Sequence, residues 1–284
     1  MGTSPGPNPE KLALAVLAQL GPTSKAIPIV AIAKALDIIE IRYEELESFE
    51  GALITTTERD IGSILINANP NNGRQRQRFT LAHELGHFLN PWHTPHNEAG
   101  FMCGKADIKF GGFHIKPGLS RYEVQELEAN SFAIELLAPK QRIISLSNDD
   151  ASVSDVLRIS SELELSKEAA ARRYVETHPG KIAVVFTLNG EVKYSVKSPL
   201  CSTLAVQKGA RFLLPSNHQP SKITCEEIEV ELPLFNGRAK SKTAEAETFH
   251  QKGGHAFTIL NFEQENEEED ETGIEDAYER FSRF

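Results

Sequence analysis

Apolar side chains recur at helical spacing through most of the first 180 residues. The repeat is clear at 77–89, which Asn90 and Pro91 bring to an end. Segments with this spacing predict helices at residues 12–20, 29–36, 77–89, 121–137, 154–163 and 166–176. Two short apolar runs, 52–56 and 63–67, predict a pair of strands ahead of the third helix.

The pattern changes after residue 180, where apolar and polar residues alternate with a period of two. The runs 181–188 and 191–196 flank an Asn-Gly pair, which is typical of a two-residue hairpin turn. Alternation at 224–231 and 256–262 predicts two further strands. The fold class is therefore expected to be α+β: helices with a small antiparallel sheet, followed by a β-rich region.

These changes of pattern divide the chain into five segments. They are an N-terminal tail and helix at 1–24, a mixed helix and strand domain at 25–150, a linking helical pair at 151–179, a β-rich C-terminal domain at 180–262 and an acidic tail at 263–284. The tail holds ten acidic residues and two arginines, which accounts for most of the net charge of −10. Such a charge density cannot bury a core, so we expect the tail to be disordered.

Composition and charge narrow the class of protein further. Outside the tail the charges nearly balance, which argues against a broad nucleic-acid surface and against direct DNA binding. Three cysteines are too few for a disulfide framework, so a cytoplasmic location is expected. No apolar run approaches the length that spans a bilayer, and no membrane partner is expected.

A metal-binding pattern lies on the helix predicted at 77–89. His83 and His87 of the sequence HELGH are four residues apart, so both imidazoles project from one helix face and can hold a zinc ion. Glu84 lies about 100° further around the helix, where it can reach a water molecule on that ion without displacing it. Zinc lowers the pKa of such a water toward about 7, which makes Glu84 the expected general base. The alternative is that both histidines are ordinary hydrogen-bonded side chains.

A catalytic zinc needs a third protein ligand, and the helix predicted at 121–137 offers several carboxylates. Glu126 shares a face with Asn130 and with small apolar residues, so this face should pack inward, where a buried carboxylate needs a cation. Glu126 is therefore favoured, with Glu123 as the weaker alternative. Asn130 is expected to hydrogen-bond the free ring nitrogen of a ligating histidine, or else only the backbone. A second face, expected to be solvated, carries Gln125, Glu128 and Glu135.

Three separated stretches of the chain resemble the ImmA/IrrE family of bacterial and phage metallopeptidases. They are RFTLAHELGHF at 78–88, ELEANSFA at 126–133 and LLAP at 136–139. The similarity extends over roughly residues 25–178. It implies a compact zincin-like, gluzincin-like domain in which His83, His87 and Glu126 bind zinc and Glu84 is the catalytic base.

The same resemblance implies a substrate. Members of this family cleave helix-turn-helix repressors of the Xre type, which relieves repression after stress or on induction of a mobile element. Many relatives carry a fused helix-turn-helix domain, which residues 12–36 are too short to form, so the substrate is expected to be a separate protein. The region at 180–262 matches no motif, and a sensory role for it is left open.

Two other classes of function compete with a zinc endopeptidase. The first is a non-catalytic, zinc-containing sensor or binding protein that sequesters a repressor. The second is a DNA-binding regulator that uses the helices at 154–176, where Arg172 and Arg173 are the notable basic residues. The scarcity of other basic residues there argues against the second.

Three features near the motifs have open roles. The residues that could donate a hydrogen bond to an oxyanion are His93, His96, His114 and Tyr122, in or near a long loop predicted at 91–120.

The strand at 63–67 can offer an edge to an extended substrate, unless it is paired on both sides. Cys103 can reach the fourth zinc position as a thiolate and hold the enzyme inactive, although most free cysteines are simply small buried groups.

Overall fold

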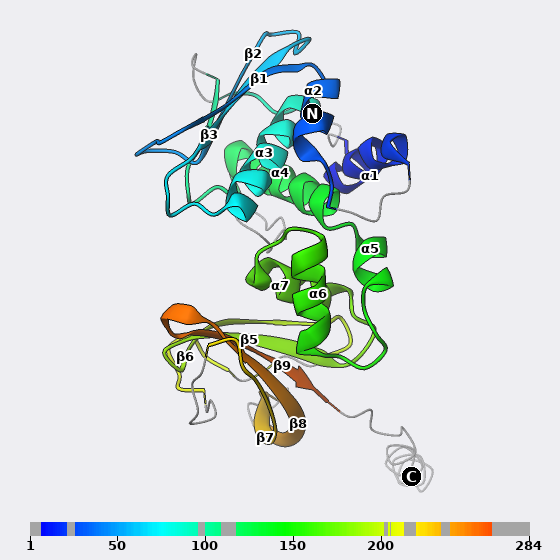
Figure 1. The fold of residues 1–284 in the computed structure, drawn as a ribbon, viewed down its shortest axis with the longest axis vertical. Helices are drawn as coiled ribbons and strands as arrows, with labels where there is room; N and C mark the ends of the chain where they lie inside the picture. The colour runs from blue at the N-terminus through cyan, green and yellow to red at the C-terminus, as the bar shows by residue number, and fades with distance from the viewer. Residues whose placement is uncertain are drawn as a thin grey trace, which may run out of the picture. The chain divides into compact units, whose positions relative to one another are not determined.

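A computed structural model describes the chain in two compact units, Met1–His178 and Pro179–Phe284 (Figure 1). The described residues are 7–21, 26–95, 100–108, 118–201, 204, 206–212, 220–233 and 239–262. The acidic tail expected at 263–284 lies outside them. Among the described helices, none has the length and apolar character needed to cross a bilayer.

Four strands form the sheet of the first unit. They are β1 (Ile38–Glu44), β2 (Gly51–Thr55), β3 (Gly62–Asn67) and β4 (Phe101–Cys103), in the order β1-β3-β2-β4. The predicted strands correspond to β2 and β3, which pair antiparallel, as do β2 and β4. The small sheet was expected to be antiparallel throughout, but β1 pairs parallel with β3. Because β3 is hydrogen-bonded on both sides, the prediction that it offers a free edge is wrong.

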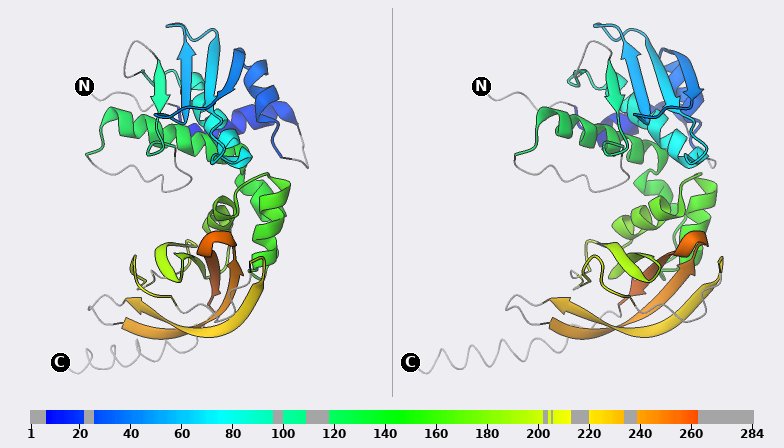
Figure 2. Two further views of the ribbon diagram at one scale, coloured as in Figure 1. Left: turned by 60° about the vertical axis from the view of Figure 1, so that its left-hand side comes forward. Right: turned by 90° about the vertical axis from the view of Figure 1, so that its left-hand side faces the viewer.

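Four helices accompany this sheet: α1 (Pro9–Leu20), α2 (Ile29–Ala35), α3 (Arg74–Leu89) and α4 (Arg121–Leu137). Helices α2 and α3 contact the strands, α4 packs against α3, and α1 packs against α4. Figure 2 shows the strands lying across α3, with α4 on the other side of that helix. The bounds of α4 are those predicted, because Ser120 and Glu123 form a capping box at its start. Helix α3 begins three residues earlier than predicted, at Arg74.

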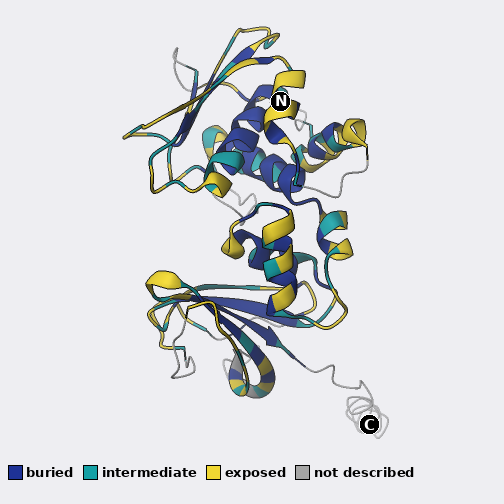
Figure 3. Cartoon of the chain, viewed as in Figure 1, coloured by how far each residue is buried: buried dark blue, intermediate teal, exposed yellow. Residues whose placement is uncertain are grey.

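The close approach of α3 to α4 depends on Gly86. A β-carbon at Gly86 would lie 3.0 Å from Phe132 Cδ1 and 3.3 Å from Ala129 Cα. Both helices are therefore buried over most of their length (Figure 3). The prediction that Gln125 and Glu135 lie on a solvated face is wrong, since both side chains are buried. Helix α4 is covered on several faces, by α3 and by α1 among others.

Three helices complete the first unit: α5 (Lys140–Ser145), α6 (Val153–Glu162) and α7 (Lys167–Thr177). The last two match the predicted helical pair within one residue at either end, whereas α5 was not predicted. Arg173 of α7 is buried, forms an ion pair with Glu135 of α4 and donates to the Ala138 carbonyl. Arg172 pairs with Glu176 along the helix. Both arginines on which the DNA-binding alternative relied are thus engaged within the unit.

The second unit is a five-stranded antiparallel sheet in the order β6-β5-β9-β8-β7. Its strands are β5 (Ile182–Leu188), β6 (Glu191–Lys197), β7 (Ile223–Pro233), β8 (Ala239–His250) and β9 (His255–Asn261), with a short 3₁₀ turn at Lys252–Gly254. The β5–β6 hairpin turns at Asn189 and Gly190, whose φ angles of 52° and 78° suit a type I′ turn. Val185, Leu260 and Phe262 belong to its apolar core. The predicted α+β class with a β-rich second region is confirmed.

Candidate metal centre

Helices α3 and α4 bring metal-donor groups of three residues together. The distance between His83 Nε2 and His87 Nε2 is 3.1 Å, and Glu126 Oε2 lies 3.1 Å from His83 Nε2. Glu126 Oε1 lies 3.4 Å from His87 Nε2. Tetrahedral zinc with bonds of 2.0–2.1 Å to nitrogen and oxygen separates its ligand atoms by about 3.3 Å. The three donors therefore already stand at the spacing that zinc requires.

The tautomer of His83 is fixed by Asn130. The Asn130 amide nitrogen donates to the Asp107 carbonyl at 2.7 Å, which leaves Asn130 Oδ1 facing His83 Nδ1 at 3.0 Å. His83 Nδ1 must then carry a hydrogen, and Nε2 is the ring nitrogen that faces the centre and can bind a metal ion. Asn130 thus makes both of the hydrogen bonds that the sequence suggested as alternatives.

His87 is held from behind in the same way by His93. His87 Nδ1 lies 2.9 Å from His93 Nδ1, and His93 Nε2 lies 2.9 Å from Glu128 Oε2. The Glu128 carboxylate can only accept, so His93 Nε2 donates to it and His93 Nδ1 accepts from His87. His87 Nε2 therefore carries no hydrogen, and its lone pair faces the centre. His93 contacts the side of His87 that faces away from the centre, so it is not available as an oxyanion donor. Glu128 orients His93, a role that was not expected from its predicted place on a solvated face.

The charges of this cluster favour a cation. Burial lowers the pKa of His87 to about 3, so its imidazole is neutral at neutral pH. Burial alone would raise the pKa of Glu126, but its contacts with His83 and His87 outweigh burial and hold that pKa below its ordinary value. Burial alone would lower the pKa of His83, but the hydrogen bond and the charge of Glu126 outweigh burial and raise it. A buried carboxylate thus favours positive charge at this position, which a metal ion bound by His83, His87 and Glu126 would supply, so the residues fit a metal ion.

Glu84 lies beside the three donors without being one of them. Its side chain is fully buried, and burial raises its pKa to about 8. Neither of its carboxylate oxygens makes a well-formed hydrogen bond among the described residues. The thiol of Cys103 lies near enough to Glu84 to lower this pKa slightly, but burial outweighs that effect. Glu84 is therefore a carboxylate that can hold or release a proton near neutral pH.

Cys103 completes a group of four potential ligands. The donor atoms of His83, His87, Cys103 and Glu126 all lie within 4.8 Å of one another, and all four residues are buried. Burial raises the pKa of the Cys103 thiol, so without a cation it is protonated at neutral pH. Glu123, the alternative third ligand, is exposed and is used in the cap of α4.

Arg59 fixes the end of the helix that carries the histidines, a role that its place in a turn did not reveal. Its guanidinium donates to the carbonyls of His87 and Asn90 at 2.5 Å each and also to the His93 carbonyl. These carbonyls include helix-end acceptors that lack partners within the helix. The same guanidinium lies 5.3 Å from the centre of the Phe101 ring. Arg59 thereby ties the end of α3 to β4.

Of the other oxyanion candidates, His96 and His114 lie outside the described residues. Tyr122 at the start of α4 is partly buried, and burial together with a hydrogen bond to Asp107 raises the pKa of its phenol. Glu126 and Cys103 also contribute to that pKa, which places the phenol near the cluster. Tyr122 remains protonated at neutral pH and is able to donate a hydrogen bond.

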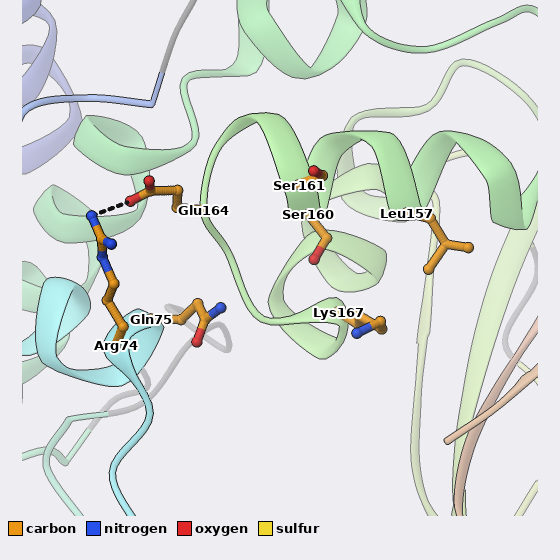
Figure 4. Close-up of a pocket in the computed structure, with 7 residues that line it drawn as sticks. All are labelled: Arg74, Gln75, Leu157, Ser160, Ser161, Glu164 and Lys167. Atoms are coloured by element: carbon orange, nitrogen blue, oxygen red, sulfur yellow. Dashed lines mark ion pairs between the residues drawn. The ribbon is translucent and has the colours of Figure 1, made fainter. Parts of the chain in front are cut away.

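A surface hollow of about 460 Å³ lies elsewhere in the first unit (Figure 4). Its lining residues are Arg74, Gln75, Leu157, Ser160, Ser161, Glu164 and Lys167. Arg74 and Glu164 form an ion pair at its edge, at 3.5 Å. None of the clustered metal donors lines this hollow.

Comparison with known families agrees with this geometry. The model of the IrrE N-terminal-like domain, named Peptidase_M78, matches residues 37–94, which contain HELGH but stop before α4. A search of curated protein sequences gave no match to the chain. The matched segment runs from β1 to just beyond α3, which is the part of the unit that holds the histidines. The resemblance inferred from the motifs is thus confirmed over residues 37–94, which match the model of the IrrE N-terminal-like domain.

Proposed function

We propose that the first unit is a zinc-dependent endopeptidase. One observation carries this proposal: the donor atoms of His83, His87 and Glu126 converge beside Glu84, a buried carboxylate that is not one of the donors. Both histidines have hydrogen bonds that turn Nε2 toward the centre. The family match supports the peptidase class.

When bound, zinc would supply a Lewis acid that polarises a peptide carbonyl and lowers the pKa of a water molecule. Glu84 takes a proton from the attacking water and passes it to the leaving amine. A pKa of about 8 in the metal-free protein suits this exchange, and a nearby cation would lower it so that Glu84 starts as a base. Tyr122 keeps its proton in a hydrogen bond to Asp107, and we propose that this hydroxyl turns from Asp107 to donate to the developing oxyanion.

We propose narrow specificity, with an Xre-type helix-turn-helix repressor as the substrate. Cleavage would derepress stress or mobile-element genes, in the cytoplasm. Support for this substrate comes from the family resemblance. Support for narrow specificity comes from the burial of His83, Glu84 and His87, which have no exposed surface. Only a chain segment of suitable shape can reach such a centre.

The test uses purified protein with and without zinc, incubated with repressors that are encoded beside its gene. Mass spectrometry of the products reports both cleavage and the cut site. Glu84→Gln should abolish cleavage while zinc binding persists, because Glu84 is not a donor. Tyr122→Phe should lower kcat about 100-fold, as expected for the loss of one oxyanion donor. Cleavage by Glu84→Gln at the wild-type rate would contradict the proposed mechanism.

Cys103 favours a second candidate, a zinc-containing sensor or binding protein that sequesters a repressor without cutting it. A fourth protein donor is typical of structural zinc sites. Under this alternative, Glu84→Gln would leave repressor release intact and no cleavage products would form with the wild type. The same incubation therefore separates the two candidates.

A further inference from the structure

Strand β4 places Cys103 at a fixed position next to the centre. Cys103 pairs with Gly51 across the β2–β4 ladder, and its carbonyl accepts from the Glu50 amide at 2.9 Å. Residues paired across a ladder point to the same face, so the thiol points to the face where Gly51 meets Glu84. Its side chain is 1% exposed. The thiol is therefore held by the sheet.

The distances from this sulfur agree with those of a zinc ligand. Cys103 Sγ lies 3.6 Å from His87 Nε2 and 3.9 Å from Glu126 Oε1. Tetrahedral zinc, with a Zn–S bond of about 2.3 Å, separates sulfur from a nitrogen or oxygen ligand by about 3.6 Å. No pair among the four donor atoms is more than 4.8 Å apart. The sulfur therefore lies within reach of a fourth ligand position.

Burial alone does not single out Cys103. Cys201 is also buried, at 5% exposure, but it packs in the apolar core of the second unit. Cys225 is exposed. Among the described residues only Cys103 joins imidazole and carboxylate donors, in a group that meets the spacing of a metal site.

We propose that Cys103 is the fourth protein ligand and that its coordination closes the centre in the resting protein. This inference rests on the proposed zinc site. Coordination replaces the S–H bond by a metal–sulfur bond and releases one proton to solvent. Catalytic zinc sites keep one position open, whereas sites with four protein ligands are closed. The peptidase is therefore latent until Cys103 leaves the metal.

Cobalt(II) titration of the full-length protein tests this directly, because cobalt reports its ligands spectroscopically. Wild type and the matched control Cys201→Ser should show a sulfur-to-cobalt charge-transfer band in the near ultraviolet. Cys103→Ser and Cys103→Ala should lose that band and keep the visible bands of cobalt bound to the remaining donors. Zinc affinity, measured by chelator competition, should fall at least about 10-fold in both Cys103 variants. With zinc and a cleaved repressor, Cys103→Ala should turn over faster than wild type.

Three results would overturn the inference. If wild type shows the visible cobalt bands without the near-ultraviolet band, Cys103 is not a ligand and the proposed peptidase stands. If the band persists in Cys103→Ser, its sulfur belongs to another residue. If wild type shows no cobalt bands at all, the metal centre itself is wrong and the proposed function fails with the inference. Circular dichroism of both Cys103 variants checks that each is folded.

Discussion

The carboxylate of Glu84 lies directly against the backbone of Gly51. A β-carbon at Gly51 would be 2.5 Å from Glu84 Oε1 and 2.5 Å from Thr80 Cγ2, too close for either atom to remain in place. The first residue of β2 therefore sets the position of the proposed base on α3. Any side chain at this glycine would push the base away from the donors.

We predict that Gly51→Ala lowers kcat about 100-fold, because a displacement of about 1 Å in a reacting group has that effect. Zinc affinity should change little, since Glu84 is not a donor. The φ angle of Gly51 is not positive, so the backbone tolerates alanine. Gly73→Ala is the matched control, because its β-carbon would lie 3.4 Å from Gln75 Oε1. Full activity of Gly51→Ala would show that the contact does not position the base.

The hydrogen bonds that link His87 to His93 and His93 to Glu128 give a second prediction. Glu128→Leu should weaken zinc binding by about 10-fold to 100-fold, because His93 loses the acceptor that fixes its tautomer and, through it, that of His87. Chelator competition measures the change. Glu123→Gln is the control, since glutamine can replace glutamate in a capping box. Equal zinc affinities for the Glu128 and Glu123 variants would refute a role for Glu128 in orienting His87.

The buried ion pair between Arg173 and Glu135 gives a third prediction. Arg173→Met should lower the free energy of unfolding by about 3–5 kcal/mol, because it leaves Glu135 buried without its partner. The double variant with Glu135→Leu should recover most of the loss. Arg172→Met, which breaks the partly exposed pair with Glu176, should cost about 0.5 kcal/mol or less. Urea unfolding followed by circular dichroism ranks the three variants.

We predict that His178, at the end of the first unit, lowers the free energy of unfolding in acid. Burial lowers its pKa below the ordinary value of 6.5, and a hydrogen bond with the Asn148 backbone and the charges of Asp155 and Asp149 only partly oppose this. The unfolded chain therefore binds the proton more readily than the folded protein. The contribution of His178 to the free energy of unfolding should be fully present above pH 6.5 and should be lost as the pH drops from 6.5 toward the lower pKa of the folded state.

Urea unfolding of wild type and His178→Gln at about pH 7.5 and about pH 5.5 checks this prediction. The variant should lose less stability between the two pH values, because it lacks the titrating group. His255→Gln, at an exposed position in the second unit, should behave as wild type does. The same pH dependence in His178→Gln and wild type would assign the acid sensitivity to other groups.

The sequence by itself determined the features that follow from local geometry. Histidines four residues apart on a helix share a face, and Glu126 and Asn130 share one for the same reason, so what each helix offers to the cluster was readable before the fold. The Asn189-Gly190 turn was readable because both residues accept positive φ. Strand β8 could not be predicted from the sequence, because its lysines, glutamates and alanines have weak β propensity. This segment forms a strand because it pairs with β7 on one side and β9 on the other.

The tertiary structure alone decided which distant groups meet at the centre. β4 is three residues long, and only its pairing with β2 brings Cys103 to the donors. His93 and Arg59 reach the end of α3 from loops, where no periodicity marks a role. Such contacts depend on how the sheet, α3 and α4 pack in three dimensions. Spacing along the chain carries no record of that packing, whereas spacing within one helix fixes its own faces.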